Sequence, residues 1–203
     1  ISEREIMRVV RPLGMAMIRD GDTYRKVEKP WPEDLDPWTH FLHSASGNAV
    51  SQDGRVGPPR RLRWSADTRW GRSHEMNNSF VAWVTDHGRM FYIFDHGLTG
   101  MEDPRLPERW TLIARDAFNG VLLWKRDIEQ WHPALWPLKS GPASLPRRLV
   151  AVGGVVYVTL GIDATVTALD AATGETLREY AKSAGAEEII HHNGVLLVLV
   201  SRT

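Results

Sequence analysis

Residues 114–124 read Ala-Arg-Asp-Ala-Phe-Asn-Gly-Val-Leu-Leu-Trp, and residues 168–178 read Ala-Leu-Asp-Ala-Ala-Thr-Gly-Glu-Thr-Leu-Arg. Both stretches fit the pattern Ala-x-Asp-Ala-x-(Thr/Asn)-Gly. A carboxylate at the third position can cap a turn, and a glycine at the seventh can close it in the left-handed conformation as a bulge. These residues are Asp116 and Gly120 in the first copy, and Asp170 and Gly174 in the second. Apolar runs flank both turns, so each copy predicts a β-hairpin.

Three further hairpins are expected from runs of aromatic and β-branched residues around a tight glycine turn. They cover residues 80–94, 149–160 and 188–200, with turns at 86–89, 153–154 and 193–194. Asn-Gly at 193–194 is the strongest short hairpin signal of the three. The two kinds of hairpin alternate along the chain, which predicts units of four short antiparallel strands.

A unit of four strands repeated at about 40–50 residues is typical of a β-propeller blade. The two Asp residues are 54 positions apart (Asp116 to Asp170), and inserts at 96–108 and 130–146 account for the excess. These inserts contain Pro, Gly and Trp, as expected of long rim loops. We therefore predict an all-β fold, a partial β-propeller of four-stranded antiparallel blades with long inter-strand inserts. The expected blades are residues 80–126, 147–181 and an incomplete third at 187–203.

Residues 1–79 predict an irregular N-terminal region. A short helix is expected within 1–10, where Ser2 and Glu5 form a capping box. A hairpin is expected at 14–27 with its turn at Asp20-Gly21, and a strand at 60–64.

Composition excludes several classes of protein. The 203 residues hold 25 Lys and Arg against 25 Asp and Glu, so a nucleic-acid binder or a protein of anionic membrane surfaces is not expected. No run approaches the about 20 apolar residues of a membrane span. The absence of cysteine excludes disulfides, thiolate nucleophiles and Cys-ligated metals. Because the chain begins at Ile1 and ends just after an apolar run, we expect a fragment of a longer protein.

The full unit at 114–124, which ends in Trp, resembles the repeat of pyrroloquinoline-quinone (PQQ) propellers. This group includes quinoprotein alcohol dehydrogenases and the outer-membrane assembly propeller. The resemblance spans about residues 79 to 200, and Trp38-Thr-His-Phe-Leu-His43 is similar to a segment that often opens such propellers. As a whole, the chain looks most like part of a large bacterial PQQ-binding-like propeller protein of the planctomycete type.

The resemblance implies that Trp124 docks on a neighbouring blade and that Gly120 supplies the turn such docking needs. The second copy departs from the repeat, because Arg178 stands where the Trp would be, and Tyr180 is expected to cover part of that surface. The adjacent cysteines typical of quinoprotein dehydrogenases are missing, and no calcium-ligand set or catalytic base can be assigned. No catalytic or metal residue is therefore predicted, and a PQQ-binding residue cannot be named.

The function expected from the resemblance is a non-catalytic scaffold or binding surface within a larger exported protein, periplasmic or secreted. Its partners would be the remaining blades and a protein or small-molecule ligand. The alternative is a fragment of a PQQ-dependent dehydrogenase that oxidises alcohols or sugars. A propeller that binds a sugar or a peptide is a further alternative. No nucleic acid and no membrane span are expected.

Several polar clusters could carry chemistry, but each has a simpler structural interpretation. His40 and His43 with Asp36 nearby would suit a metal, yet the flanking Pro37 favours a loop held by hydrogen bonds. Neighbouring residues on a strand point to opposite faces, so His191 and His192 cannot chelate together.

Carboxylate pairs, arginine clusters and tryptophans complete the set of candidates. The carboxylate pairs are Glu102-Asp103 and Glu187-Glu188; the arginines are Arg60, Arg61, Arg63, Arg69, Arg72, Arg147 and Arg148; the tryptophans are Trp64, Trp70, Trp110, Trp131 and Trp136. For the carboxylates the favoured interpretation is solvated charge. For the arginines it is a charged strand edge that discourages pairing, with an anionic ligand as the alternative. For the tryptophans it is inter-blade packing, with a stacking surface for a ligand or partner as the alternative.

Overall fold

The computed structural model describes residues 2–55, 57–58, 60–67, 71, 78–97, 108–129, 131 and 144–201. The chain divides into two compact units, one of Ile1–Asp36 with Gln52–Leu62 and one of Pro37–Ser51 with Arg63–Thr203. The boundary that the sequence suggested, at residue 79, lies inside the second unit. Most of the inserts at 96–108 and 130–146 is outside the described residues.

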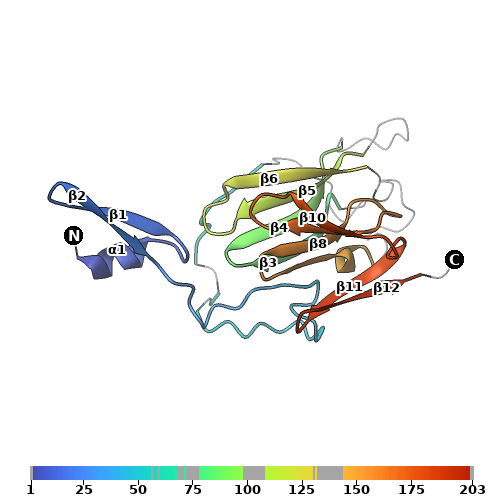
Figure 1. Ribbon diagram of the computed structural model, residues 1–203, viewed down its shortest axis with the longest axis horizontal. Coiled ribbons are helices and arrows are strands. Elements are labelled where there is room, and N and C mark those ends of the chain that lie inside the picture. The colour runs from blue at the N-terminus through green and yellow to red at the C-terminus, as the bar shows by residue number, and fades with distance from the viewer. Residues whose placement is uncertain are drawn as a thin grey trace. The chain divides into compact units, whose positions relative to one another are not determined.

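The smaller unit contains one helix and one hairpin (Figure 1). Helix α1 (Glu3–Val9) begins at Ser2, whose Oγ accepts a hydrogen bond from the Glu5 N–H at 3.3 Å. Strands β1 (Met15–Asp20) and β2 (Thr23–Glu28) pair antiparallel and turn at Gly21, which has a φ of +61°. The helix and the hairpin predicted from the sequence are confirmed.

The larger unit contains ten strands in three antiparallel sheets within its described residues (Figure 1). The first sheet has the order β3-β4-β5-β6, the second β10-β9-β8-β7 and the third β11-β12. The strands are β3 (Phe80–Asp86), β4 (Arg89–Asp95), β5 (Trp110–Asp116), β6 (Leu122–Ile128), β7 (Leu149–Val152), β8 (Val155–Thr159), β9 (Val166–Asp170), β10 (Thr176–Tyr180), β11 (Ala186–His192) and β12 (Val195–Val200). A 3-10 helix, η1 (Leu145–Arg148), precedes β7. The predicted all-β class and the two four-stranded antiparallel sheets are confirmed.

Tight turns join the first two strands of each sheet. Both central residues of each turn have positive φ: 43° and 75° at His87-Gly88, 62° and 82° at Gly153-Gly154, and 49° and 78° at Asn193-Gly194. This is the type I′ geometry, whose twist matches that of the strands it joins. The Gly-Gly and Asn-Gly pairs in the sequence are therefore required by the turn.

The strand predicted at 60–64 is wrong. These residues pair with no strand in the described part of the chain. The alternation Arg-Leu-Arg-Trp imitates a strand, but the Trp64 side chain reaches across to the β5–β6 turn, where its Nε1 donates to the Ala117 carbonyl at 3.0 Å.

The three sheets pack face to face in sequence order. Fully buried Phe91 and Leu112 of the first sheet share one core with Leu149 and Val156 of the second. A second cluster joins the second and third sheets through buried residues that include Val150, Val166 and Ile189. In Figure 1 the β3–β6 sheet accordingly lies against the sheet that contains β8 and β10.

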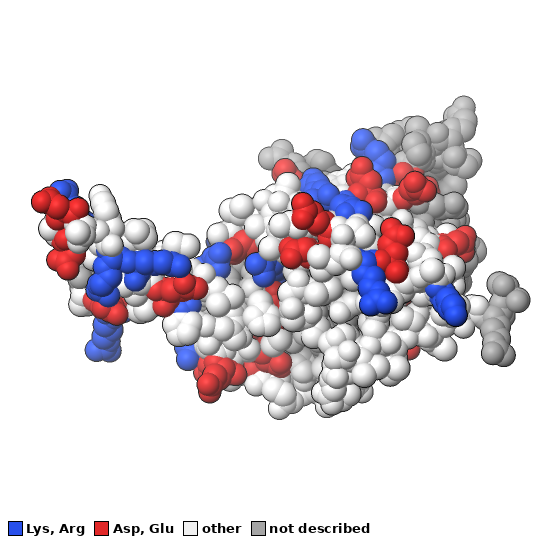
Figure 2. Space-filling model, viewed as in Figure 1, with Lys and Arg blue, Asp and Glu red and all other residues white. Residues whose placement is uncertain are grey.

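Charges of both signs are interspersed on the face that Figure 2 shows, in keeping with the zero net charge of the chain. No helix among the described residues is long and apolar enough to cross a membrane.

Candidate functional site

The first strand of each sheet in the larger unit is an edge strand. The strands are β3, β7 and β11, and each uses only one side for pairing within its own sheet. The pairs next to the I′ turns are Asp86–Arg89, Val152–Val155 and His192–Val195. A pair next to a two-residue turn exchanges both hydrogen bonds, so the preceding residue points its N–H away from the hairpin. These outward N–H groups belong to Thr85, Ala151 and His191, one in each sheet.

Three successive residues accept these three hydrogen bonds. We refer to residues 38–40 as the crossing segment. The Thr85 N–H donates to the Trp38 carbonyl at 2.7 Å, and the Ala151 N–H donates to the Thr39 carbonyl at 3.0 Å. The His191 N–H donates to His40 Nε2 at 3.1 Å. The crossing segment therefore provides an acceptor for one N–H on the free edge of each of three consecutive sheets, which would otherwise be an unpaired backbone group.

The third acceptor is a side chain because the backbone reverses at His40. An isolated bridge joins His40 to His43, and the N–H groups of Thr39 and His40 both donate to the His43 carbonyl, at 2.8 and 3.2 Å. The imidazole then takes the place that a further carbonyl would have filled on β11. His40 is only 6% exposed.

The hydrogen bonds define one tautomer of His40. Nε2 accepts from the His191 N–H, so the ring proton is on Nδ1 in the neutral form. Nδ1 lies 2.8 Å from the Thr39 hydroxyl, which in turn donates to the His43 carbonyl at 3.2 Å. Burial and, to a lesser extent, the neighbouring His191 lower the pKa of His40 to about 4. The ring is thus held neutral, with both nitrogens engaged.

We expect the stability of the protein to fall as the pH drops from about 6.5 to about 4. An unfolded histidine has a pKa near 6.5, whereas that of folded His40 is about 4, so the unfolded chain binds the extra proton in this window. Above about pH 6.5 neutral His40 makes its full contribution to the free energy of unfolding, and the upper limit of this contribution is about 3 kcal/mol. Urea unfolding at about pH 7 and about pH 5 measures the loss.

His40→Gln and His40→Leu are the matched variants. The Gln side chain keeps an acceptor near the Nε2 position but does not titrate, so its stability should change less with pH than that of the wild type. The Leu side chain leaves the His191 N–H without its acceptor, and a loss of about 1–3 kcal/mol is expected at neutral pH. An identical pH dependence in the wild type and the Gln variant would contradict this role of His40.

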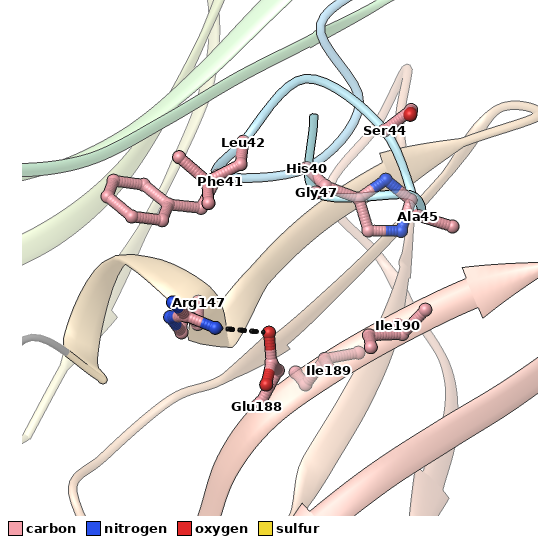
Figure 3. Close-up of a pocket in the computed structure, with 10 residues that line it drawn as sticks. All are labelled: His40, Phe41, Leu42, Ser44, Ala45, Gly47, Arg147, Glu188, Ile189 and Ile190. Atoms are coloured by element: carbon pink, nitrogen blue, oxygen red, sulfur yellow. Dashed lines mark hydrogen bonds and ion pairs between the residues drawn. The ribbon is translucent and has the colours of Figure 1, made fainter. Parts of the chain in front are cut away.

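A pocket lies beside the crossing segment (Figure 3). Its lining comes from the loop after His40, from η1 and from β11: His40, Phe41, Leu42, Ser44, Ala45, Gly47, Arg147, Glu188, Ile189 and Ile190. Arg147 and Glu188 point toward each other, with 2.8 Å between Nη1 and Oε1. The Arg147 guanidinium also lies 6.0 Å from the centre of the Phe41 ring.

The volume of this pocket limits what it can bind. It is about 50 Å³, room for roughly three or four water molecules. Pockets for whole small molecules measure about 300–1,000 Å³. This pocket can therefore hold a small polar group or the end of a side chain, and it is too small for a quinone cofactor.

The two Asp-x-x-x-Gly turns have the same internal hydrogen bonds. Asp116 Oδ1 accepts from the N–H groups of Phe118 and Asn119, at 2.9 and 3.2 Å. Asp170 Oδ1 accepts from those of Ala172 and Thr173, both at 2.8 Å, and these bonds lower the pKa of Asp170. The glycines that end the turns have φ values of +75° and +76°.

Each of these turns receives a tryptophan from an earlier part of the chain. The Trp124 Nε1 of β6 donates to the Ala171 carbonyl at 3.1 Å, and a Cβ added to Gly174 would lie 2.6 Å from its ring. Trp64 makes the same contact with the preceding turn, where a Cβ on Gly120 would lie 2.5 Å from the ring. Trp124 thus contacts the turn of Gly174, whereas Gly120 accommodates Trp64, a partner that the sequence did not reveal.

The remaining histidine and carboxylate candidates form no metal-binding group among the described residues. His191 stacks on Tyr157 at 5.4 Å, and Asp36 belongs to the smaller unit. No group of three His, Asp or Glu side chains suited to a metal occurs among the described residues. Glu102 and Asp103 lie outside the described residues.

The arginine and tryptophan candidates have different surroundings. Arg148 is buried and donates to the Ile162 carbonyl at 2.7 Å, whereas Arg60, Arg61 and Arg63 are exposed. Trp110 and Trp131 are buried. Arg69, Arg72, Trp70 and Trp136 lie outside the described residues.

No protein-family model matches the chain, and no curated protein matches it.

Proposed function

We propose that this chain is a section of a β-propeller that acts as a non-catalytic scaffold and binding surface. The observation that carries the proposal is the crossing segment. In a propeller the sheets are arranged radially around a central channel. We assign the strands nearest the channel to β3, β7 and β11, because residues 38–40 hold these three edge strands side by side.

The repeated tryptophan contact supports the same proposal. Two successive Asp-x-x-x-Gly turns each receive an indole whose Nε1 donates to a carbonyl of the turn, at 3.0 and 3.1 Å. Repeat proteins are built from such nearest-neighbour interfaces between equivalent units. The resemblance to PQQ-repeat propellers agrees with this contact, and export to the periplasm or the outside of a bacterial cell is proposed from that resemblance alone.

A binding role suits the chemistry of the pocket better than catalysis does. His40 has both ring nitrogens in hydrogen bonds that hold the crossing segment, and Arg147 is paired with Glu188. Groups engaged in this way position a ligand or a neighbouring protein, while a general acid or base must be able to exchange its proton with substrate. We propose that the pocket accepts a small polar group at the edge of a larger binding surface.

We expect the purified chain, incubated with PQQ and Ca²⁺, to reduce no redox dye when alcohols or sugars are added. The physical reason is that the pocket beside the crossing segment, at about 50 Å³, is far smaller than a small-molecule site. A PQQ-dependent alcohol dehydrogenase is the positive control for the assay. Dye reduction that requires PQQ, Ca²⁺ and a substrate together would overturn the proposal in favour of a quinoprotein dehydrogenase fragment.

A further inference from the structure

We propose that the outer edge of β12 and the Arg178–Tyr180 pair of β10 together receive a β-hairpin that carries an Asp-x-x-x-Gly turn. The proposal rests on the propeller function proposed above and names the partner that the third sheet takes. It depends on two separate surfaces, which a single hairpin can contact at once.

The first surface is the edge of β12. In the first two sheets the second strand is paired on both sides, β4 with β3 and β5, and β8 with β7 and β9. Strand β12 pairs only with β11 among the described strands. Because Val195 and Leu197 pair with β11 in the hydrogen-bonded register, the N–H groups of Leu196 and Val198 point to the other edge.

The side chains of β12 favour a strand as the occupant of this edge. Val195, Leu197 and Leu199 are 55–57% exposed and lie on one face of the strand. Figure 2 shows a largely uncharged area over this hairpin. Edge strands that avoid pairing usually carry a charge or a proline, and the sequence Val-Leu-Leu-Val-Leu-Val has neither.

The second surface lies on β10 and matches the position of the docking tryptophan. In the first sheet Trp124 pairs with Ala114 and Arg126 with Leu112. In the second sheet Arg178 pairs with Ala168 and Tyr180 with Val166, which are the equivalent positions. Arg178 therefore occupies the place of Trp124, and Tyr180 that of Arg126.

Trp124 and Arg126 show what this position does when it is filled. Trp124 packs flat on Gly174, and Arg126 Nη1 donates to the Gly174 carbonyl at 2.7 Å. One aromatic ring and one guanidinium thus hold the turn of the next sheet. The ring requires a residue without a Cβ, and the guanidinium requires an accessible carbonyl.

Arg178 and Tyr180 offer the same two groups with their positions exchanged. The Arg178 guanidinium lies 5.1 Å above the Tyr180 ring, and Arg178 itself is exposed. An open hollow of about 450 Å³ lies here, lined by residues 178–183. An Asp-x-x-x-Gly turn would place its glycine on this pair while the strand before the turn lies along β12, as β9 does along β8.

The test adds a synthetic peptide of residues 164–181, which contains β9, its turn and β10, to the ¹⁵N-labelled chain. At about 1 mM peptide we expect amide exchange at Leu196 and Val198 to slow by about tenfold or more, with Leu197 unchanged. Arg178→Ala in the labelled protein should weaken binding by about tenfold, because a charge-assisted hydrogen bond is lost. A Gly174→Val peptide, whose turn carries a branched side chain, should not protect these amides.

Several outcomes would overturn the proposal. Unchanged exchange at Leu196 and Val198 shows that the edge takes no such strand, and equal binding of the Gly174→Val peptide shows that the turn is not recognised. Protection of both amides without peptide, together with a concentration-dependent dimer, assigns the edge to a second copy of the chain. The amides of Thr85, Ala151 and His191 report separately on the propeller arrangement, so failure of that proposal remains distinguishable.

Discussion

Gly174→Ala is expected to destabilise the protein by about 3 kcal/mol. Two costs add at this position. The residue has a φ of +76°, which costs an L-residue about 1–2 kcal/mol, and a Cβ would lie 2.6 Å from the Trp124 ring. The indole is confined between two sheets and cannot move away without loss of its hydrogen bond to Ala171. Urea unfolding of the purified variant measures the effect.

Gly194→Ala is the matched control for this substitution. Gly194 has nearly the same φ, +78°, but nothing lies within 4 Å of the added Cβ. Its cost should therefore be the backbone cost alone, about 1–2 kcal/mol. Equal destabilisation by the two variants would show that the Trp124 ring does not press on Gly174 in solution.

Trp124→Ala is expected to cost about 3–5 kcal/mol, the range for removal of a large buried aromatic side chain. Trp124 is 8% exposed and its ring contacts the second sheet, so removal of the side chain takes away packing and the hydrogen bond to Ala171 together. Leu123→Ala, one position earlier and 40% exposed, should cost less than about 1 kcal/mol. Thermal or urea unfolding of both variants provides the comparison.

The double variant tests whether Trp124 and Gly174 act on each other. Once the indole is absent, Gly174→Ala should retain only its backbone cost, which gives a coupling of about 1–2 kcal/mol in a double-mutant cycle. Strict additivity of the two substitutions would show that the sheets are joined in another way.

The local parts of this fold could be predicted because single residues determine them. Gly-Gly at 153–154 and Asn-Gly at 193–194 supply the positive φ values that a type I′ turn needs. In each repeated turn the Asp carboxylate accepts from N–H groups two and three residues later, and the Gly N–H donates to the carbonyl of that Asp. Such constraints act over short distances along the chain, so the sequence pattern is sufficient to reveal them.

The crossing segment could not be predicted in the same way. Trp38 and Thr39 accept through backbone carbonyls, which every residue carries, from partners 47 to 112 positions away. His40 is the one side chain that marks the segment, and the sequence favoured a loop held by hydrogen bonds without indicating its partner, the N–H of His191. Trp64 was a candidate for inter-blade packing, but its partner was missed for a similar reason, since alternation with arginines imitates a strand while the contact is with a turn 53 residues later.

Amide hydrogen exchange at Thr85, Ala151 and His191 tests most directly whether three consecutive sheets meet at residues 38–40. Each N–H is on the free edge of its own sheet and has its acceptor only in the crossing segment. The amides of Leu196 and Val198, on the outer edge of β12, are internal references for an edge without such an acceptor. We predict that all three amides exchange at least about tenfold more slowly than these references. Exchange of Thr85, Ala151 and His191 as fast as that of Leu196 and Val198 would contradict the arrangement.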